Sequence, residues 1–223
     1  MKVIVFGATG MVGQAVVRQC LLEDRVTSVL IVGRSSAGVS DPKVEELIHG
    51  DFLDFSSVAT ELTGYDACFF CLGVSAAGMS EPAYRRVTYF MTMAAARELA
   101  ERNAKMRFLY ISGAGTDSTE HGRTIWARIK GETENAVLSL PFEGYALRPG
   151  YIQPRHGVQS RNKLYRNIYR VTGRLYPALA RVAPKYFIAS DELALAMINI
   201  AANGSEKRIL ESSDLVRSAA QPV

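Results

Sequence analysis

The sequence predicts an α/β fold: a Rossmann-type doubly wound parallel sheet with helices on both faces and a small C-terminal lobe. An apolar run at residues 3–6 leads directly into glycines spaced three apart, and an apolar helical pattern follows. Short apolar runs and helical patterns then alternate over about 150 residues, as is typical of parallel sheets covered by helices. The length of 223 residues fits one domain.

We divide this domain into four parts. Residues 1–153 form the Rossmann core, and residues 154–188 form a small basic lobe. Residues 189–211 return to the core as a helix and a short strand, with Ser190 as the helix N-cap. Residues 212–223 are small and polar and predict a poorly ordered tail.

The glycine segment has the position and spacing of a dinucleotide-binding turn. Gly7 lets the chain turn out of the strand, Gly10 leaves room for a pyrophosphate, and Gly13 lets the next helix approach the sheet. The N–H groups at the start of that helix favour phosphate. The alternative is a tight turn that binds nothing. The residues expected to contact the dinucleotide are Gly7, Ala8, Thr9, Gly10, Met11, Val12 and Gly13.

The end of the second strand, residues 29–32, predicts which dinucleotide is preferred. An NAD-binding fold has an Asp or Glu there for the ribose 2′-hydroxyl, whereas this chain has Arg34 and no nearby carboxylate. A guanidinium suits a 2′-phosphate, and Ser35 and Ser36 can add hydroxyl donors. We therefore expect NADP (NADPH) in preference to NAD, and the alternative is a solvated arginine in a loop.

The third and fourth strands, residues 44–48 and 67–72, add further candidates. Asp51 could accept a hydrogen bond from the adenine amino group, or it could serve only the turn that it occupies. Phe52, next to it, is placed in the same site. Beyond the fourth strand we expect three residues to flank the pyrophosphate or the nicotinamide ribose, since ligands lie past the carboxyl ends of strands: Leu72, Gly73 and Val74.

The second half of the core completes the sheet. A helical pattern at residues 84–103 precedes strands at 107–111 and 145–148. Ser112 follows the first of these strands. Four residues after the second strand are expected at the cofactor site: Pro149, Gly150, Tyr151 and Ile152.

Composition argues against several classes of protein. No apolar run is long enough to span a bilayer, and the N-terminal run is too short for a signal peptide. Three cysteines, an odd number, argue against a disulfide framework and predict a cytoplasmic location. Cys68 and Cys71 have the spacing of a redox pair, but they lie on a predicted strand. The three histidines share no metal-ligand spacing, so we expect no metal site.

Residues 155–190 hold eight arginines and lysines and no Asp or Glu, so this segment carries +8 while the whole chain carries +4. Such a charge favours an anionic or phosphorylated small molecule, or peripheral contact with an anionic membrane. We expect no nucleic acid partner, because an amphipathic lobe explains the same residues. A homodimer is left open.

Several of these features, by their order and spacing, resemble the atypical and extended short-chain dehydrogenase/reductase superfamily. They are the glycine segment at residues 7–13, Ser112, Lys130, the Arg-Pro-Gly at 148–150 and the segment 190–194. The resemblance is closest to the small Tat-interacting-protein-like NAD(P)-binding proteins of bacteria and animals, and it covers nearly the whole chain. It implies that the basic lobe lies over the nicotinamide and shapes the substrate pocket.

The resemblance also implies a catalytic Ser, Tyr and Lys. The Ser falls on Ser112 and the Lys, which also binds the nicotinamide ribose, falls on Lys130. The Tyr position falls on Trp126, whose indole N–H cannot relay a proton. Without the Tyr, Ser112 could equally close a turn, and Lys130 could be a solvated helix residue.

Three function hypotheses follow. The first is an NADP-dependent oxidoreductase or epimerase-type enzyme on an unknown carbonyl substrate. Its acid would come from Thr124, His121, Tyr151 or a water held by Lys130, unless hydride passes directly to a flavin or quinone. The second is a non-catalytic NADPH-binding regulator or redox sensor. The third is a membrane-surface or assembly partner with a structural nucleotide.

Overall fold

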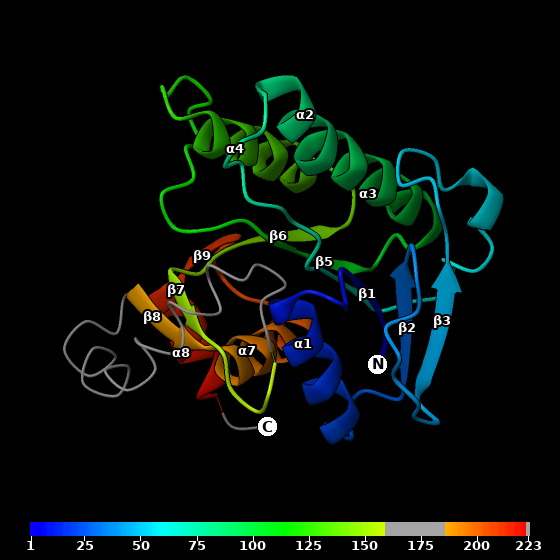
Figure 1. Cartoon of the computed structure of the whole chain (residues 1–223). Helices are drawn as coiled ribbons and strands as arrows, with labels where there is room; N and C mark the ends of the chain where they lie inside the picture. The colour runs from blue at the N-terminus through cyan, green and yellow to red at the C-terminus, as the bar shows by residue number, and fades with distance from the viewer. Residues whose placement is uncertain (159–185, 222–223) are drawn as a thin grey trace.

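The computed structural model describes residues 1–158 and 186–221, which are built around a seven-stranded sheet (Figure 1). The strand order is β3-β2-β1-β4-β5-β6-β9, and every neighbouring pair is parallel. The chain reverses its direction across the sheet between β1 and β4, which confirms the predicted doubly wound Rossmann-type fold. The strands are β1 Lys2–Phe6, β2 Ser28–Gly33, β3 Val44–Ile48, β4 Ala67–Phe70, β5 Arg107–Ile111, β6 Glu143–Arg148 and β9 Ile209–Glu211.

Helices cover both faces of the sheet (Figure 1). One face carries α1 Met11–Leu22, α7 Ser190–Asn203 and α8 Ser212–Ala219. The other carries α2 Glu81–Arg85, α3 Met91–Arg102 and α4 Ile125–Leu138. Two further single turns are the 3₁₀ turn Ser56–Val58 and the π-helical turn Arg86–Phe90, which joins α2 to α3. A separate parallel pair consists of β7 Tyr151–Gln153 and β8 Phe187–Ala189.

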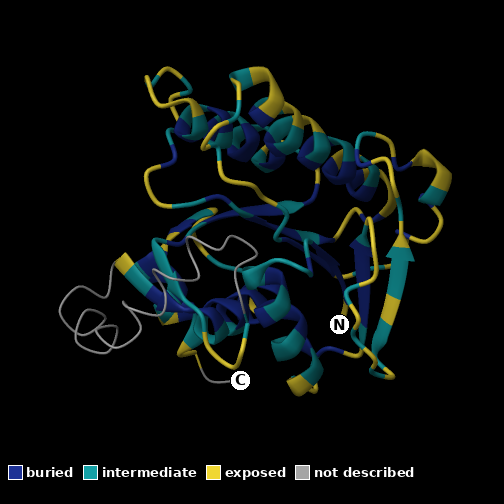
Figure 2. Ribbon diagram, in the orientation of Figure 1, coloured by how far each residue is buried: buried dark blue, intermediate teal, exposed yellow. Residues whose placement is uncertain are grey.

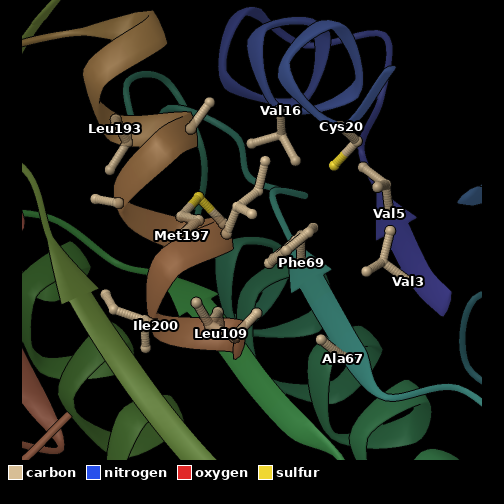
Figure 3. Packing of buried hydrophobic residues seen from close by; sticks show 14 of the residues in the cluster. Val3, Val5, Val16, Cys20, Ala67, Phe69, Leu109, Leu193, Met197 and Ile200 are labelled. Carbon is tan, nitrogen blue, oxygen red and sulfur yellow. The ribbon is translucent and has the colours of Figure 1, made fainter. Parts of the chain in front are cut away.

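Alternation along β1 divides the core into two layers. Val3 and Val5 point to the side of α1 and α7, where they join Val16, Phe69 and Met197 in one buried cluster (Figure 3). Because parallel strands between helices are buried on both faces, continuous apolar runs in the sequence were enough to locate them. Figure 2 shows the central strands as buried and the edge strand β3 as partly exposed.

The second layer, under α3 and α4, is rich in aromatic rings. Phe6 and Phe70 lie with their ring centroids 5.1 Å apart, and Phe70 and Phe108 with theirs 5.7 Å apart. Phe108 is in turn stacked on Phe142, with 5.0 Å between centroids. These rings connect the strands β1, β4 and β5 side by side, so the ends of those strands are held at fixed positions.

The turn between β1 and α1 is packed so closely that only glycine fits. Gly7 has a φ of +77°, and a Cβ there would lie 2.7 Å from the carbonyl carbon of Cys71. A Cβ on Gly13 would lie 2.1 Å from the carbonyl oxygen of Gly7. The N–H of Gly10 donates to that same oxygen at 2.9 Å. The helix α1 therefore starts directly at the edge of the sheet, beside the end of β4.

Two local predictions are wrong. The helix α7 begins at Ser190 and not after it, and the Ser190 hydroxyl accepts the N–H of Arg155 at 3.0 Å. The carboxylate of Glu192 takes the capping role, since it accepts the N–H of Ala189 at 3.0 Å. The helix expected to start at Tyr84 instead starts at residue 81, with Pro82 in its first turn.

The prediction of a poorly ordered tail at residues 212–223 is also wrong for most of that segment, because Ser212–Ala219 forms the helix α8. Its Leu215 is fully buried, and Asp214 accepts hydrogen bonds from Lys207 Nζ at 2.7 Å and from the N–H of Glu211 at 3.1 Å. A few small polar residues therefore suffice for a helix, because one buried leucine and one capping carboxylate hold it in place. Most of the predicted basic lobe, residues 159–185, lies outside the described residues.

We expect Gly13→Ala to destabilise the fold by about 1–3 kcal/mol, because the new methyl group must displace backbone atoms and not a flexible side chain. The matched control is Gly50→Ala, where no atom lies within 4 Å of the added Cβ; its effect should stay within about 0.5 kcal/mol. Urea unfolding of both variants measures the difference. Equal effects at the two positions would contradict this account of the turn.

Candidate dinucleotide site

The carboxyl ends of the central strands lie level with one another. Phe6, near the end of β1, pairs with Val32 in β2 and with Phe70 in β4, and Phe70 pairs with Tyr110 in β5. The loops that follow these strands therefore meet at one edge of the sheet. Because the chain reverses between β1 and β4, this edge is the place where open α/β sheets bind ligands.

A cleft of about 460 Å³ lies at this edge. Eleven of the predicted cofactor residues line it: Gly7, Ala8, Thr9, Gly10, Met11, Arg34, Ser35, Phe52, Leu72, Gly73 and Val74. Five further residues line the cleft and were not predicted: Ile31, Val32, Gly33, Cys71 and Ser75. Ile31 and Val32 belong to a strand that was expected to be wholly core, so their apolar pattern concealed their second role.

The start of α1 presents backbone N–H groups at the cleft. The first N–H groups of any α-helix have no intrahelical acceptor. The N-cap of α1 is Gly10, which has no side chain to accept from them. The absence of a Cβ at Gly10, in the cleft wall, leaves the backbone accessible to a phosphate. Val12 and Gly13 lie behind this wall, within α1, and act through packing. The geometry fits a pyrophosphate.

At the other end of the cleft, Arg34 and Ser35 are exposed in the loop after β2. Within the described ranges 1–158 and 186–221, Arg34 forms no ion pair with a carboxylate. Asp51 is not among the lining residues; its Oδ1 accepts the N–H of Leu53 at 2.9 Å, which is the turn alternative. Phe52 does line the cleft, and its ring packs edge-on against Phe6 with 6.1 Å between centroids.

A second cavity adjoins the cleft, and the two share Val74 and Ser75 in their walls. Ala76 and Ala77 from the segment after β4 and Tyr84 from α2 also line it, together with Trp126 and Lys130 from α4. Trp126 and Lys130 are four residues apart, so they lie on the same face of the helix. Tyr84 was not predicted as a site residue, because in the sequence it is only the first residue of the helical pattern at 84–103.

The loop after β5 passes close to α4 at two glycines. A Cβ on Gly115 would lie 3.5 Å from the Cη2 atom at the edge of the Trp126 indole, an ordinary van der Waals distance. On the next turn of α4, a Cβ on Gly131 would lie 1.8 Å from the carbonyl oxygen of Asp117. The loop after β5 is thus pressed against α4, and these two glycines were the sequence feature that could have predicted it.

Lys130 binds to the end of β5. Its Nζ donates to the carbonyl oxygen of Ser112 at 2.5 Å, and the carbonyl oxygen of Ile111 lies 3.4 Å away. It also lies 5.8 Å from the centroid of the Tyr110 ring. Burial lowers the pKa of Lys130 to about 8, and the nearby Glu134 carboxylate opposes that shift. At neutral pH Lys130 therefore carries a charge that it can lose readily.

The hydroxyl of Ser112 does not face the second cavity. Ser112 is buried and lines neither hollow, and its Oγ donates to the carboxylate of Glu134. Glu134 has no exposed surface, and Arg148 Nε donates to its two oxygens at 3.0 and 3.2 Å. Hydrogen bonding to Glu134 raises the pKa of Arg148. Sequence analysis missed this buried ion pair, which joins α4 to β6.

The segment after β6 lies against other elements. The carbonyl of Pro149 accepts the N–H of Ala114 at 2.9 Å, and the N–H of Gly150 donates to Ser212 Oγ at 2.7 Å. The Tyr151 hydroxyl donates to Gln153 Oε1 at 3.1 Å. Ile152 packs on the core beneath α7. None of the four residues after β6, which include Ile152, is among the described lining of the cleft.

The other candidate donors, His121 and Thr124, are exposed before or at the start of α4 and do not line the second cavity. Among residues 1–158 and 186–221, no group of three or more His, Cys, Asp or Glu side chains could hold a metal ion. In the same part of the chain, no helix is long and apolar enough to cross a membrane. Cys68 and Cys71 are free thiols whose pKa values are raised by burial, which makes them poor nucleophiles.

Residues 7–139, more than half of the chain, match the sequence profile of a family described as NAD(P)H-binding. The chain belongs to this NAD(P)H-binding family. The matched segment contains every predicted site residue before β6, from the glycine turn to Lys130.

Similar proteins of known name support the same assignment. The Aspergillus oryzae protein named "Protein fmp52-2, mitochondrial" is 26% identical over 228 residues, covering 96% of this chain and 94% of its own. The rat "Protein HTATIP2" is 25% identical over 155 residues, covering 68% of this chain and 62% of its own. The predicted resemblance to Tat-interacting-protein-like proteins is therefore confirmed.

The predicted cytoplasmic location is contradicted by these relatives. Proteins of the same name from Neosartorya fischeri and Aspergillus terreus also match, and all three fungal names include the word mitochondrial. The prediction rested on an odd number of cysteines. Free thiols indicate a reducing environment, but their number does not distinguish one reducing compartment from another.

Solved structures of extended dehydrogenases and epimerases share the fold. MoeE5, in complex with UDP-glucose and NAD, superposes with a TM-score of 0.69 at 14% identity, covering 99% of this chain and 81% of its own. The Bordetella bronchiseptica enzyme WbmF, in complex with NAD+, gives a TM-score of 0.66 at 15% identity, covering 98% and 77%. Identities this low show a common architecture and no more.

The lowered pKa of Lys130 predicts how stability depends on pH. The folded chain binds this proton less tightly than the unfolded chain, so the folded state gains stability as pH rises from about 8 to the ordinary lysine value of 10.5. We expect the free energy of unfolding of wild type minus that of Lys130→Met to increase across this window. Denaturant unfolding at several pH values measures it, and a flat or falling difference would contradict a buried, charge-penalised amine.

The buried ion pair of Glu134 and Arg148 predicts a large loss of stability when only one of its two charges is removed. Glu134→Gln removes the buried counter-charge of the Arg148 guanidinium and leaves it only the exposed Glu211 carboxylate, 3.5 Å away, so we expect it to cost about 3–5 kcal/mol of stability. The control is Glu98→Gln, which removes a carboxylate from the surface pair with Arg102 and should cost less than about 1 kcal/mol. If both variants unfold at the same denaturant concentration, the pair does not join α4 to β6 as described.

Proposed function

We propose that the chain is an NADP(H)-dependent oxidoreductase that acts on a carbonyl substrate. The observation that carries this proposal is the second cavity, which shares Val74 and Ser75 with the dinucleotide cleft and presents Lys130. A pure nucleotide-binding module has no need for an adjoining hollow with a cationic side chain. Family membership supports the dinucleotide itself.

The residues supply binding, orientation and charge. The start of α1 binds the pyrophosphate, and Arg34 with Ser35 binds the 2′-phosphate of the adenosine ribose. When bound, the nicotinamide supplies two electrons and a hydrogen as hydride. Lys130 binds the ribose or polarises a substrate oxygen, since its ammonium has three donors and reaches two carbonyls.

The missing tyrosine supports a second candidate, a non-catalytic NADPH-binding regulator. By the family resemblance, Trp126 occupies the position of the catalytic Tyr, and the indole has no acidic proton to give. Ser112, whose expected role is to hold the substrate oxygen, has its hydroxyl bonded to Glu134. Turnover distinguishes the two candidates: an enzyme consumes NADPH with a carbonyl compound, whereas a regulator binds NADPH and leaves it unchanged.

We expect calorimetry to show tighter binding of NADPH than of NADH. Arg34→Ala should weaken NADPH binding about 10- to 100-fold, as expected for the loss of charge-assisted hydrogen bonds, and leave NADH binding nearly unchanged. The control is Arg97→Ala, which removes an exposed positive charge from α3, outside the cleft. Equal losses for both dinucleotides in Arg34→Ala would contradict a 2′-phosphate site, and binding of neither would overturn the proposal.

A further inference from the structure

The second cavity combines a flat aromatic wall with one cation. Trp126 forms one side, and it is the only tryptophan in the chain. Val74, Ala76 and Ala77 are small and apolar, so they leave the cavity wide beside the indole. A Cβ on Gly115 would lie 3.5 Å from the Cη2 atom at the edge of the indole, so the missing side chain leaves space beside the ring. This arrangement fits a planar, conjugated ligand better than a branched or heavily hydroxylated one.

Lys130 places positive charge in the same cavity. Its ammonium has three N–H donors, and the carbonyl oxygens of Ser112 and Ile111 can take two of them. Within residues 1–158 and 186–221 the third N–H has no protein acceptor, so it can serve an oxygen atom in the cavity that Lys130 lines.

The neighbouring groups are poor proton donors. The indole N–H of Trp126 is not acidic, and the Ser112 hydroxyl donates to Glu134. The Tyr84 side chain is almost fully buried, and burial raises its pKa, which makes it a weaker acid than an ordinary phenol. A substrate that needs a strong acid at the moment of hydride transfer is badly served by this cavity.

The need for an acid depends on the oxyanion that the substrate forms. Hydride addition to an aliphatic carbonyl leaves an alkoxide, a base comparable to hydroxide, whose conjugate acid water has a pKa of about 15.7. Hydride addition to a quinone, followed by aromatisation, leaves a phenolate, whose conjugate acid has a pKa of about 10. The phenolate is stable enough to be held by an ammonium alone and to take its proton later from water.

We propose that the substrate class of this site is quinones, with the ring stacked on Trp126 and the developing phenolate oxygen bound by Lys130. This inference rests on the proposed function. The hydride adds to a ring carbon conjugated with one carbonyl, and the π electron pair of that C=O moves onto the oxygen that Lys130 binds. The carbon that received the hydride then loses a proton to solvent, which makes the ring aromatic. Solvent protonates the two oxygens to complete the hydroquinone, and the dinucleotide leaves as NADP+. The missing tyrosine is then a feature of substrate choice and not a loss of activity.

Binding can be tested without the dinucleotide. Since Trp126 is the only tryptophan, its fluorescence reports on this cavity alone. We expect 2-methyl-1,4-naphthoquinone to quench it saturably, whereas cyclohexane-1,4-dione, which has two carbonyls and no conjugation, should not. Quenching of free N-acetyltryptophanamide gives the collisional background. Quenching that is no stronger than that background, or that rises linearly without saturating, would overturn the inference.

Quinones are reactive on their own, so turnover is compared between two substrates and between wild type and a Trp126 variant. Trp126→Tyr restores a phenolic donor four residues before Lys130, and a general acid is worth about 10²- to 10⁴-fold. We therefore expect at least a tenfold rise in kcat/KM for the aliphatic dione and no comparable rise for the naphthoquinone. A parallel rise for both substrates, or efficient reduction of the dione by wild type, would overturn the proposal.

Lys130 variants test the oxyanion contact. Lys130→Met should lower quinone kcat at least tenfold while changing the quench midpoint less, because the charge acts on the anion and the stacking does not depend on it. Lys130→Arg keeps the charge and should recover part of the loss. Unchanged quinone turnover in Lys130→Met would overturn the proposal.

The proposed function and this inference fail in different experiments. If calorimetry shows no NADPH binding, the proposed function fails. If NADPH binds and the quinone experiments fail, only this inference fails.

Discussion

The contact between the backbone of Gly7 and the first turn of α1 is the constraint on which the site depends. Because the carbonyl of Gly7 occupies the space of a Cβ at Gly13, the helix begins at the sheet edge with its N–H groups facing the cleft. The same glycine lets the end of β4 approach from the other side, at Cys71. Packing of backbone on backbone thus places an anion-binding helix end at the point where the chain reverses across the sheet.

The other half of the site depends on α4 in a different way. Lys130 and Glu134 lie one turn apart on the helix, and they reach respectively the end of β5 and the Arg148 side chain of β6. A buried ion pair contributes little net stability compared with apolar packing, but it is specific, because only one register satisfies both charges. The pair joins α4 to β6, and Trp126 and Lys130 of the same helix line the second cavity.

The strands and the glycine turn could be predicted because their causes are local. Apolar runs buried on both faces located β1, β2 and β5 closely, and the spacing of Gly7, Gly10 and Gly13 defined the turn. Predictions failed where a distant residue decided the outcome. Ser112 is bonded to Glu134 from another element, and Tyr84 belongs to a cavity wall. Spacing along the chain carries no information on such long-range partners.

The packing of α7 on the sheet and of β9 at its edge also constrains how the protein is made. The apolar face of α1, near the N-terminus, is covered by α7, and the edge of β6 is paired by β9, so residues 190–211 complete both. During synthesis these elements leave the ribosome after α1 and β6. Until then α1 and the β6 edge stay uncovered, and the nascent chain carries an exposed apolar surface that chaperones recognise. The helix whose first turn forms part of the cleft wall is therefore covered only after residues 190–211 have been synthesised.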